Sequence, residues 1–184
     1  IRLRIPAVKR ILSRNGIKPN TILEAGVGIG AYANIWRQLG TGKWVGVDIS
    51  PRAIDDVAVR FPQGEFHVMN IARTNNDPLV GRQFELVTAI DVLYHIVEDG
   101  EFKAALIWLL SKIQSGGYLL VSDVFTDSPY GQRFSHVRRR PLRDYIGVLE
   151  PGGFELCDRE PVFSILGDPV PDVRGRGKAL FLIW

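Results

Sequence analysis

The residues of this chain that could do chemistry stand where predicted strands end. The first group closes residues 21–30 (TILEAGVGIG), which predict a buried strand that runs into a glycine-rich turn, with a helix directly after it. Gly26, Gly28 and Gly30 would let the backbone approach a ligand closely, because glycine carries no Cβ. The helix behind the turn adds unpaired N–H groups at its positive end. The segment therefore predicts a site for a small ligand, although a strand–turn–helix corner without a ligand has the same pattern.

An acidic residue ahead of the turn indicates the charge of that ligand. The dinucleotide-binding pattern G-x-G-x-x-G needs a third glycine where this chain has Ala31 or Ala33. Glu24 instead stands two residues before Gly26, so the pattern is E-x-G-x-G-x-G. A carboxylate at this place suits a ligand that carries positive charge, and it would repel a pyrophosphate.

A second acidic residue, Asp48, ends the strand predicted at 44–48, about twenty residues beyond the glycine turn. An acidic side chain at that place can accept hydrogen bonds from both ribose hydroxyls of a nucleoside. The alternative is an aspartate that caps the next helix, but Ser50 already fills the N-cap position and Pro51 the first helical position. Ile49 would then lie against the face of an adenine.

His95 and Asp123 are the candidate catalytic groups. His95 follows the strand predicted at 86–90, and an unperturbed pKa of about 6.5 would let it act as a general base at neutral pH. A helix-capping or packing role is the alternative for this histidine. Asp123 stands near the end of the strand predicted at 118–124, where it would either bind substrate or cap the following loop.

Length and composition describe a single ordinary domain, residues 1–184, with a sizeable core. The net charge of +3 is too small to argue for a nucleic acid or a membrane as partner. The single cysteine, Cys157, excludes an internal disulfide and a cysteine-based zinc cluster. No apolar run approaches about 18 residues and no signal peptide is recognisable, so we expect a cytoplasmic protein. The first residue is Ile1 rather than Met, which leaves open whether residues precede it.

The order of the predicted elements indicates an α/β fold. Strand signals fall at 21–25, 44–48, 65–69, 86–90 and 118–124, and helix signals at 5–14, 31–39, 52–60, 102–113 and 141–149. The strands are near-continuous apolar runs, as expected of a doubly wound parallel sheet that is covered on both faces. Two final strands, at 154–159 and 178–184, are joined without a predicted helix, so we expect an antiparallel pair.

In this order the motifs resemble those of class I S-adenosylmethionine-dependent methyltransferases, in the branch that acts on small molecules. The resemblance rests on the E-x-G-x-G-x-G turn, on Asp48, on residues 66–71 (FHVMNI) and on residues 86–96 (LVTAIDVLYHI). It spans residues 21–184 and implies a Rossmann-like methyltransferase fold. That fold is a doubly wound, mostly parallel seven-stranded sheet with an antiparallel C-terminal strand.

The resemblance implies S-adenosylmethionine as the cofactor and S-adenosylhomocysteine as the product. Asn70 stands where the family commonly has an aspartate that binds the adenine amino group, and its carbonyl oxygen can still accept. An asparagine in a turn after a strand is the alternative for this residue. Asp91 is expected near the methionine half of the cofactor. The residues that the resemblance places around the cofactor are Glu24, Gly26, Gly28, Gly30, Tyr32, Asp48, Ile49, Asn70, Ile71 and Asp91.

The implied reaction is methyl transfer to an O, N or C nucleophile of a small molecule, such as a sugar or a natural-product intermediate. The N-terminal helix (residues 1–18) and the loop at 125–145 are expected to cover the substrate, and both are too short to bind a large polymer. The basic stretch at 133–145 would bind an anionic substrate, or it is a solvated helix entry. No paired-carboxylate metal site is recognisable, so we predict a metal-independent enzyme.

Three other functions stay open at this point. A protein of this kind could bind the cofactor and act as a non-catalytic regulatory or scaffold subunit. An RNA methyltransferase is less favoured because the aromatic residues form no stacking platform. A nucleotide-binding oxidoreductase is disfavoured by Glu24 and by the missing third glycine. The acceptor and the oligomeric state are not encoded in any motif.

Overall fold

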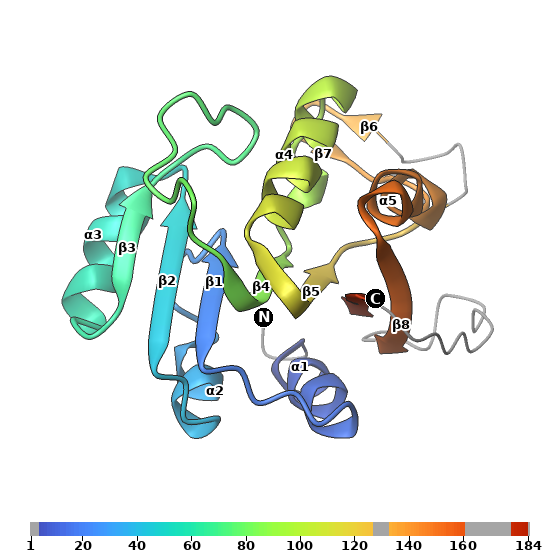
Figure 1. Cartoon of the computed structure of the whole chain (residues 1–184). Coiled ribbons are helices and arrows are strands. Elements are labelled where there is room, and N and C mark those ends of the chain that lie inside the picture. Colours follow the sequence, from blue (N-terminus) through green and yellow to red (C-terminus); the bar gives the residue numbers. More distant parts are fainter. Residues whose placement is uncertain (1–3, 127–132, 161–177, 184) are drawn as a thin grey trace.

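A seven-stranded sheet runs through the protein, with helices on both of its faces (Figure 1). The computed structural model describes residues 4–126, 133–160 and 178–183. The strands of the sheet are β1 (Thr21–Ala25), β2 (Lys43–Asp48), β3 (Glu65–Val68), β4 (Phe84–Ile90), β5 (Ile113–Ser122), β8 (Phe154–Glu160) and β9 (Lys178–Ile183). The helices are α1 (Arg4–Arg14), α2 (Ala33–Gln38), α3 (Pro51–Arg60), α4 (Asp99–Ser111) and α5 (Leu142–Leu149), with 3-10 turns η1 (Leu93–His95) and η2 (Glu150–Gly152). A separate antiparallel pair is formed by β6 (Arg133–Phe134) and β7 (Val137–Arg138).

The strand order places a reversal of the chain path between β1 and β4. The order is β3-β2-β1-β4-β5-β9-β8, so the chain runs outward from β1 to β3 and then returns to the other side of β1. Both neighbours of β1 are parallel to it, with Ala25 level with Val47 on one side and Ala89 on the other. In open α/β sheets, ligands bind outside the carboxyl ends of the strands at such a switch point.

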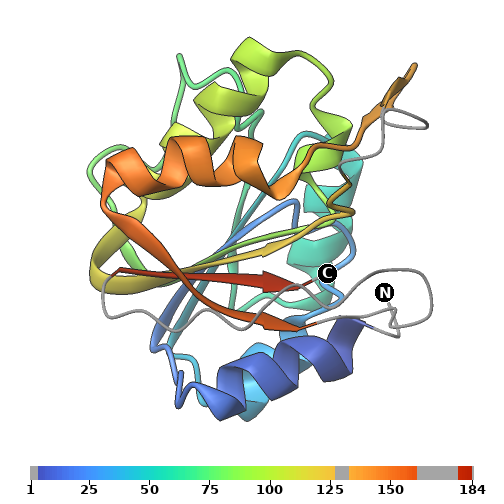
Figure 2. The ribbon, with the colours of Figure 1, turned by 90° about the vertical axis from the view of Figure 1, so that its right-hand side faces the viewer.

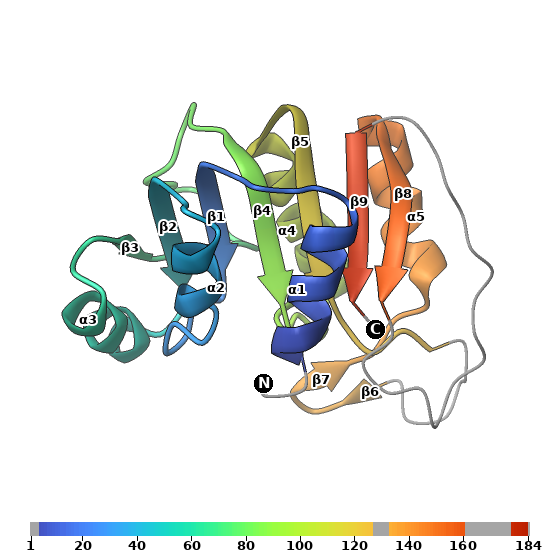
Figure 3. The same ribbon diagram turned by 90° about the horizontal axis from the view of Figure 1, so that it is seen from below.

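Helices cover both faces of the sheet, which confirms the predicted doubly wound α/β architecture. Figure 2 shows the sheet nearly edge-on between α1 on one side and α4 and α5 on the other, and Figure 3 shows α1 and α2 in front of the strands. Successive residues of one strand enter different cores: Ile22 packs with α1, α2 and α3, whereas Leu23 packs with α4 and α5. The near-continuous apolar runs in the sequence arise from this burial on both faces.

The predicted antiparallel C-terminal strand is wrong. β9 lies between β5 and β8 and is parallel to both of them. An antiparallel hairpin needs only about two connecting residues, whereas a parallel crossover needs a dozen or more. Residues 161–177, which separate β8 from β9 in the sequence, are numerous enough for a crossover.

The predicted end of the helix before β5 is also wrong. α4 ends at Ser111, two residues before the predicted end at residue 113, and Gly116 and Gly117 lie inside β5. Gly116 has a φ of +76°, and the pairing of β5 with β4 shifts register at this place, between Phe84 and Leu86. The two glycines therefore lie in an irregular stretch of β5, and the positive φ of Gly116 favours glycine there.

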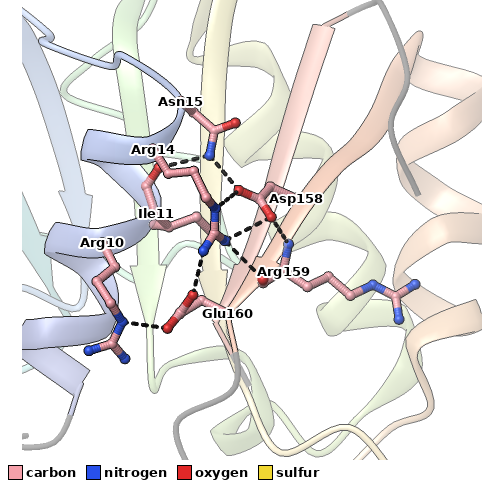
Figure 4. Close-up of polar contacts among 7 residues, drawn as sticks. All are labelled: Arg10, Ile11, Arg14, Asn15, Asp158, Arg159 and Glu160. Atoms are coloured by element: carbon pink, nitrogen blue, oxygen red, sulfur yellow. Dashed lines mark hydrogen bonds and ion pairs between the residues drawn. The ribbon is translucent and has the colours of Figure 1, made fainter. Parts of the chain in front are cut away.

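Helix α1 is fastened to the edge strand β8 by a network of charged groups (Figure 4). Arg14 donates to both carboxylate oxygens of Asp158 at 2.8 Å and to Glu160 at 2.9 Å. Arg10 binds the other oxygen of Glu160 at 2.6 Å, and the Asn15 amide binds Asp158. The buried apolar residues of α1 are Ala7, Val8, Ile11 and Leu12. Most of the predicted lid at residues 1–18 is thus a packed helix.

No helix within the described residues is long and apolar enough to cross a membrane.

Candidate active site

A pocket of about 590 Å³ opens at the switch point, beside the ends of β1, β2 and β4. Its volume is in the range of pockets for small ligands and cofactors. Of the site residues predicted from the sequence, the pocket wall includes Gly26, Asp48, Ile49, Asn70, Ile71, Asp91 and His95. These residues come from four separate stretches of the chain, and the parallel sheet brings them to one edge.

The glycine turn at the pocket is held in a conformation that favours glycine. Gly26 has a φ of +72° and lies against Val92, so that an added Cβ would overlap the Val92 methyl group. Gly30 has a φ of +71°, but an added Cβ there would stand 2.7 Å from the Phe61 ring, which is outside the pocket. Gly26 therefore lines the ligand site, whereas Gly30 permits close packing against α3.

Asp48 closes the turn from the neighbouring strand. Its carboxylate accepts the Gly28 N–H and the Ser50 N–H, both at 2.9 Å. The Ser50 hydroxyl accepts the Ala53 N–H at 3.3 Å and caps α3, which confirms the predicted cap. A carboxylate has about four acceptor positions. Asp48 can therefore hold the turn and still accept hydrogen bonds from a ligand.

Apolar and amide groups line the pocket beyond Asp48. Ile71 is buried and Ile49 is exposed, and both belong to the pocket wall. The Asn70 side-chain oxygen accepts the Ala72 N–H at 2.9 Å, so this residue forms a turn as well as lining the pocket. The turn role that the sequence left open for Asn70 is thus present, and its contact with an adenine stays a prediction. This part of the pocket suits a flat aromatic ring with polar groups on its edge.

Asp91 and Arg4 form an ion pair beside the glycine turn. Their nearest nitrogen and oxygen are 2.8 Å apart, and Arg4 also donates to the Ser122 hydroxyl at 3.0 Å. Burial raises the pKa of Asp91, and the charge of Arg4 opposes that rise. Among the described residues, Asp91 is the one non-glycine with a positive φ, at 60°, and such strain clusters at functional sites. The pair offers complementary charges to a ligand that carries both an ammonium and a carboxylate.

Arg4 was missed by the sequence analysis. It stands far from Asp91 in the sequence, and only the docking of α1 brings the two together. The one signal that could have found it was the basic character of the N-terminal helix.

Tyr32 stands two residues after Gly30 and is not part of the pocket wall. Its side chain is 5% exposed, and its buried hydroxyl has no hydrogen-bond partner within the described part of the chain. Burial is the main cause that raises the pKa of this phenol, and the charge of Asp91 adds to the rise. An unpaired buried hydroxyl is costly. The Tyr32 hydroxyl is thus a buried polar group near the charge of Asp91 whose hydrogen bond is not supplied by the described residues.

The structure does not bring Glu24 into the pocket. Its side chain is 2% exposed, and it accepts the indole N–H groups of Trp36 at 2.8 Å and Trp44 at 3.0 Å. Burial raises the pKa of Glu24 to about 7, although both indole hydrogen bonds act in the opposite direction. The predicted contact with a cationic ligand is therefore replaced by a structural role, in which Glu24 joins α2 and β2 beneath the turn.

The two candidate catalytic groups differ in their placement. Asp123 is 1% exposed, accepts a hydrogen bond from the Tyr145 hydroxyl of α5 and is not part of the pocket wall. Burial raises its pKa to about 6. His95 is exposed and lines the pocket, with Nδ1 3.4 Å from the His136 carbonyl oxygen. Of the two candidate catalytic groups, the pocket wall thus includes His95 but not Asp123, and a catalytic role of His95 stays a prediction.

Two arginines of the basic stretch at 133–145 are used inside the fold. Arg140 is 2% exposed, stacks over Phe102 at 4.1 Å and pairs with Asp99 at 3.2 Å. Arg138 binds the same carboxylate at 2.8 Å. These two arginines fasten the β6–β7 hairpin to the start of α4. Their charges are already paired with the Asp99 carboxylate. Part of the predicted lid, residues 127–132, lies outside the described residues.

A family model of methyltransferase domains matches residues 2–150. The chain therefore belongs to the methyltransferase-domain family. This membership confirms the class that the motifs predicted, namely an S-adenosylmethionine-dependent methyltransferase. No curated protein matches the chain in sequence.

Solved structures share the fold at low sequence identity. KedS8, a sugar N-methyltransferase from Streptoalloteichus sp ATCC 53650, has a TM-score of 0.67 at 12% identity, over 82% of this chain and 79% of that one. The magnesium protoporphyrin IX methyltransferase ChlM from Synechocystis PCC 6803, with bound SAM, has a TM-score of 0.63 at 20% identity, over 83% and 68%. The N-methyltransferase NodS from Bradyrhizobium japonicum WM9, in complex with S-adenosyl-L-homocysteine, has a TM-score of 0.54 at 20% identity, over 63% and 59%. This chain thus spans less than two thirds of that NodS chain, and these likenesses show the fold alone.

The residues in and beside the pocket fit S-adenosylmethionine. The turn at Gly26 leaves space that a Cβ would fill, the Arg4–Asp91 pair matches an amino-acid zwitterion, and the Tyr32 hydroxyl lacks a partner among the described residues. No group of three or more metal-binding side chains is gathered within the described ranges.

Proposed function

We propose that this protein transfers the methyl group of S-adenosylmethionine to an O, N or C nucleophile of a small molecule, such as a sugar or a natural-product intermediate. The observation that carries the proposal is the pocket at the switch point, where Asp48 and the Arg4–Asp91 pair line or border one continuous space. When bound, the cofactor supplies an activated methyl group. The protein contributes position and the exclusion of water.

Each end of the pocket would hold a different part of the cofactor. Asp48 would accept the ribose hydroxyls, because its carboxylate is already oriented by two backbone N–H groups. Ile49 and Ile71 would contact the adenine ring. Asp91 would accept from the ammonium group and Arg4 would donate to the carboxylate, so one ion pair would be exchanged for two.

The acceptor is expected on the side of His95 and the β6–β7 hairpin. His95 would take up the proton if the acceptor is a hydroxyl, since its ring lines the pocket and is exposed. A short hairpin beside the site favours a small acceptor over a polymer. The sugar N-methyltransferase KedS8 and the N-methyltransferase NodS share the fold, which supports amino sugars as the first acceptors to test.

Replacing Asp48 by alanine is expected to weaken S-adenosylhomocysteine binding about 100-fold, because hydrogen bonds to a charged group contribute roughly 1.5–3 kcal/mol each. Isothermal titration calorimetry with S-adenosylhomocysteine and NAD measures this effect. Asp55→Ala, an exposed change of the same charge on α3, should bind as the wild type does. If the wild type binds NAD and does not bind S-adenosylhomocysteine, the proposal is wrong.

Methyl transfer itself is tested with methyl-labelled S-adenosylmethionine and a panel of amino sugars and hydroxylated natural-product precursors. Label in any acceptor supports the proposal, and His95→Ala should lower transfer to hydroxyl acceptors. Tight cofactor binding without transfer to any acceptor would instead favour the regulatory or scaffold role.

A further inference from the structure

Glu101 places a carboxylate at the adenine end of the pocket. It lies in the first turn of α4 and belongs to the same pocket wall as Asn70, Ile71 and Ala72. Its side chain is 34% exposed, so the carboxylate is partly shielded and still accessible to a ligand. The sequence analysis did not select it, because it lies outside the strand-end motifs.

Arg73 forms an ion pair with only one of the two carboxylate oxygens of Glu101. The Arg73 Nε and Nη2 atoms are 2.8 Å and 2.7 Å from the same oxygen, Oε1 of Glu101. This ion pair joins the loop after β3 to α4 across the pocket. Because both contacts use Oε1, the Oε2 atom can accept a hydrogen bond from a ligand.

The neighbouring amide is already engaged. The Asn70 oxygen accepts the Ala72 N–H at 2.9 Å, so it is not an unused acceptor. Glu101 therefore supplies an additional acceptor at this end of the pocket, and it carries a full charge. Charged acceptors form stronger hydrogen bonds than amides do.

We propose that Glu101 recognises the 6-amino group of the cofactor's purine ring through Oε2, and that Arg73 fixes the orientation of this carboxylate. The inference rests on the proposed binding of an adenosyl cofactor and adds a specificity-determining residue to it. An amino group donates to a carboxylate. A 6-oxo group can only accept a hydrogen bond. Its oxygen would face the Oε2 atom of Glu101 with no proton between them, so a ligand with a 6-oxo purine would bind more weakly.

The test compares S-adenosylhomocysteine with S-inosylhomocysteine, which differ at position 6 of the purine. Isothermal titration calorimetry gives the ratio of the two dissociation constants for the wild type, for Glu101→Gln and for Arg73→Gln. We expect the wild type to prefer the adenosyl compound by at least about 30-fold and Glu101→Gln to lower that preference about 10-fold, since glutamine can donate to a 6-oxo group as well as accept. Arg73→Gln leaves the carboxylate in place and should lower the ratio less.

Glu98→Gln is the matched control, because it makes the same change of charge at the start of α4 and its residue is outside the pocket wall. Circular dichroism is used to check that each variant is folded. If the wild type binds S-adenosylhomocysteine and Glu101→Gln keeps the wild-type ratio, only the purine assignment is wrong. If the wild type binds neither nucleoside, the proposed function fails and this inference with it.

Discussion

Replacing Gly26 by alanine is expected to abolish detectable binding of S-adenosylhomocysteine and to lower the free energy of unfolding by about 2–5 kcal/mol. Two costs add together. The φ of +72° disfavours any residue with a Cβ, and the new methyl group would overlap the Val92 side chain. Because Val92 also lines the pocket, any shift that relieves the overlap changes the shape of the binding site.

Gly40→Ala separates the two costs of that substitution. Gly40 has nearly the same φ, +74°, but apart from its own chain neighbours no residue lies within 4 Å of the position where its Cβ would stand. Its replacement should therefore show the backbone cost alone and leave cofactor binding unchanged. Urea unfolding and calorimetry on both variants give the two quantities. Equal losses of stability, with wild-type affinity in Gly26→Ala, would show that the Val92 contact does not shape the site.

The stability of the wild type is expected to fall by about 3 kcal/mol, through Glu24 alone, as the pH rises from about 4.5 to above 7. Burial raises the pKa of Glu24 from its ordinary value of 4.5 to about 7 in the folded protein. The folded state thus holds this proton more tightly than the unfolded state does. The contribution to stability is complete below pH 4.5 and is lost as the pH rises through 7.

Glu24→Gln is expected to remove most of this pH dependence, because the amide oxygen can still accept the indole N–H groups of Trp36 and Trp44 and does not titrate. A smaller slope should persist from Asp123, whose raised pKa of about 6 acts in the same direction. Urea unfolding at pH 5, 6, 7 and 8 measures both slopes. The exposed change Glu155→Gln serves as the control. A variant with the wild-type slope would show that Glu24 is ionised throughout this range.

The residues that gather at the switch-point pocket were predictable from the sequence because their signals are local. Each depends on an apolar run that ends in a particular residue, as at Gly26, Asp48 and Asp91. Once the runs are assigned to parallel strands, their carboxyl ends must meet at one edge. The Ser50 cap and the start of α3 follow from neighbouring residues in the same way.

Other features were decided by tertiary packing, since they depend on which side of an element a residue faces and on what lies opposite. Glu24 and Asp123 stand at strand ends with the expected chemistry, yet each faces a packed helix or a neighbouring strand instead of the pocket. The Arg4–Asp91 pair exists only because α1 docks against the sheet. The direction of β9 likewise depends on pairing with β5 and β8, because the sequence before it fits a hairpin or a crossover equally well. Local patterns determine where a strand ends, whereas long-range contacts determine what its last side chains meet.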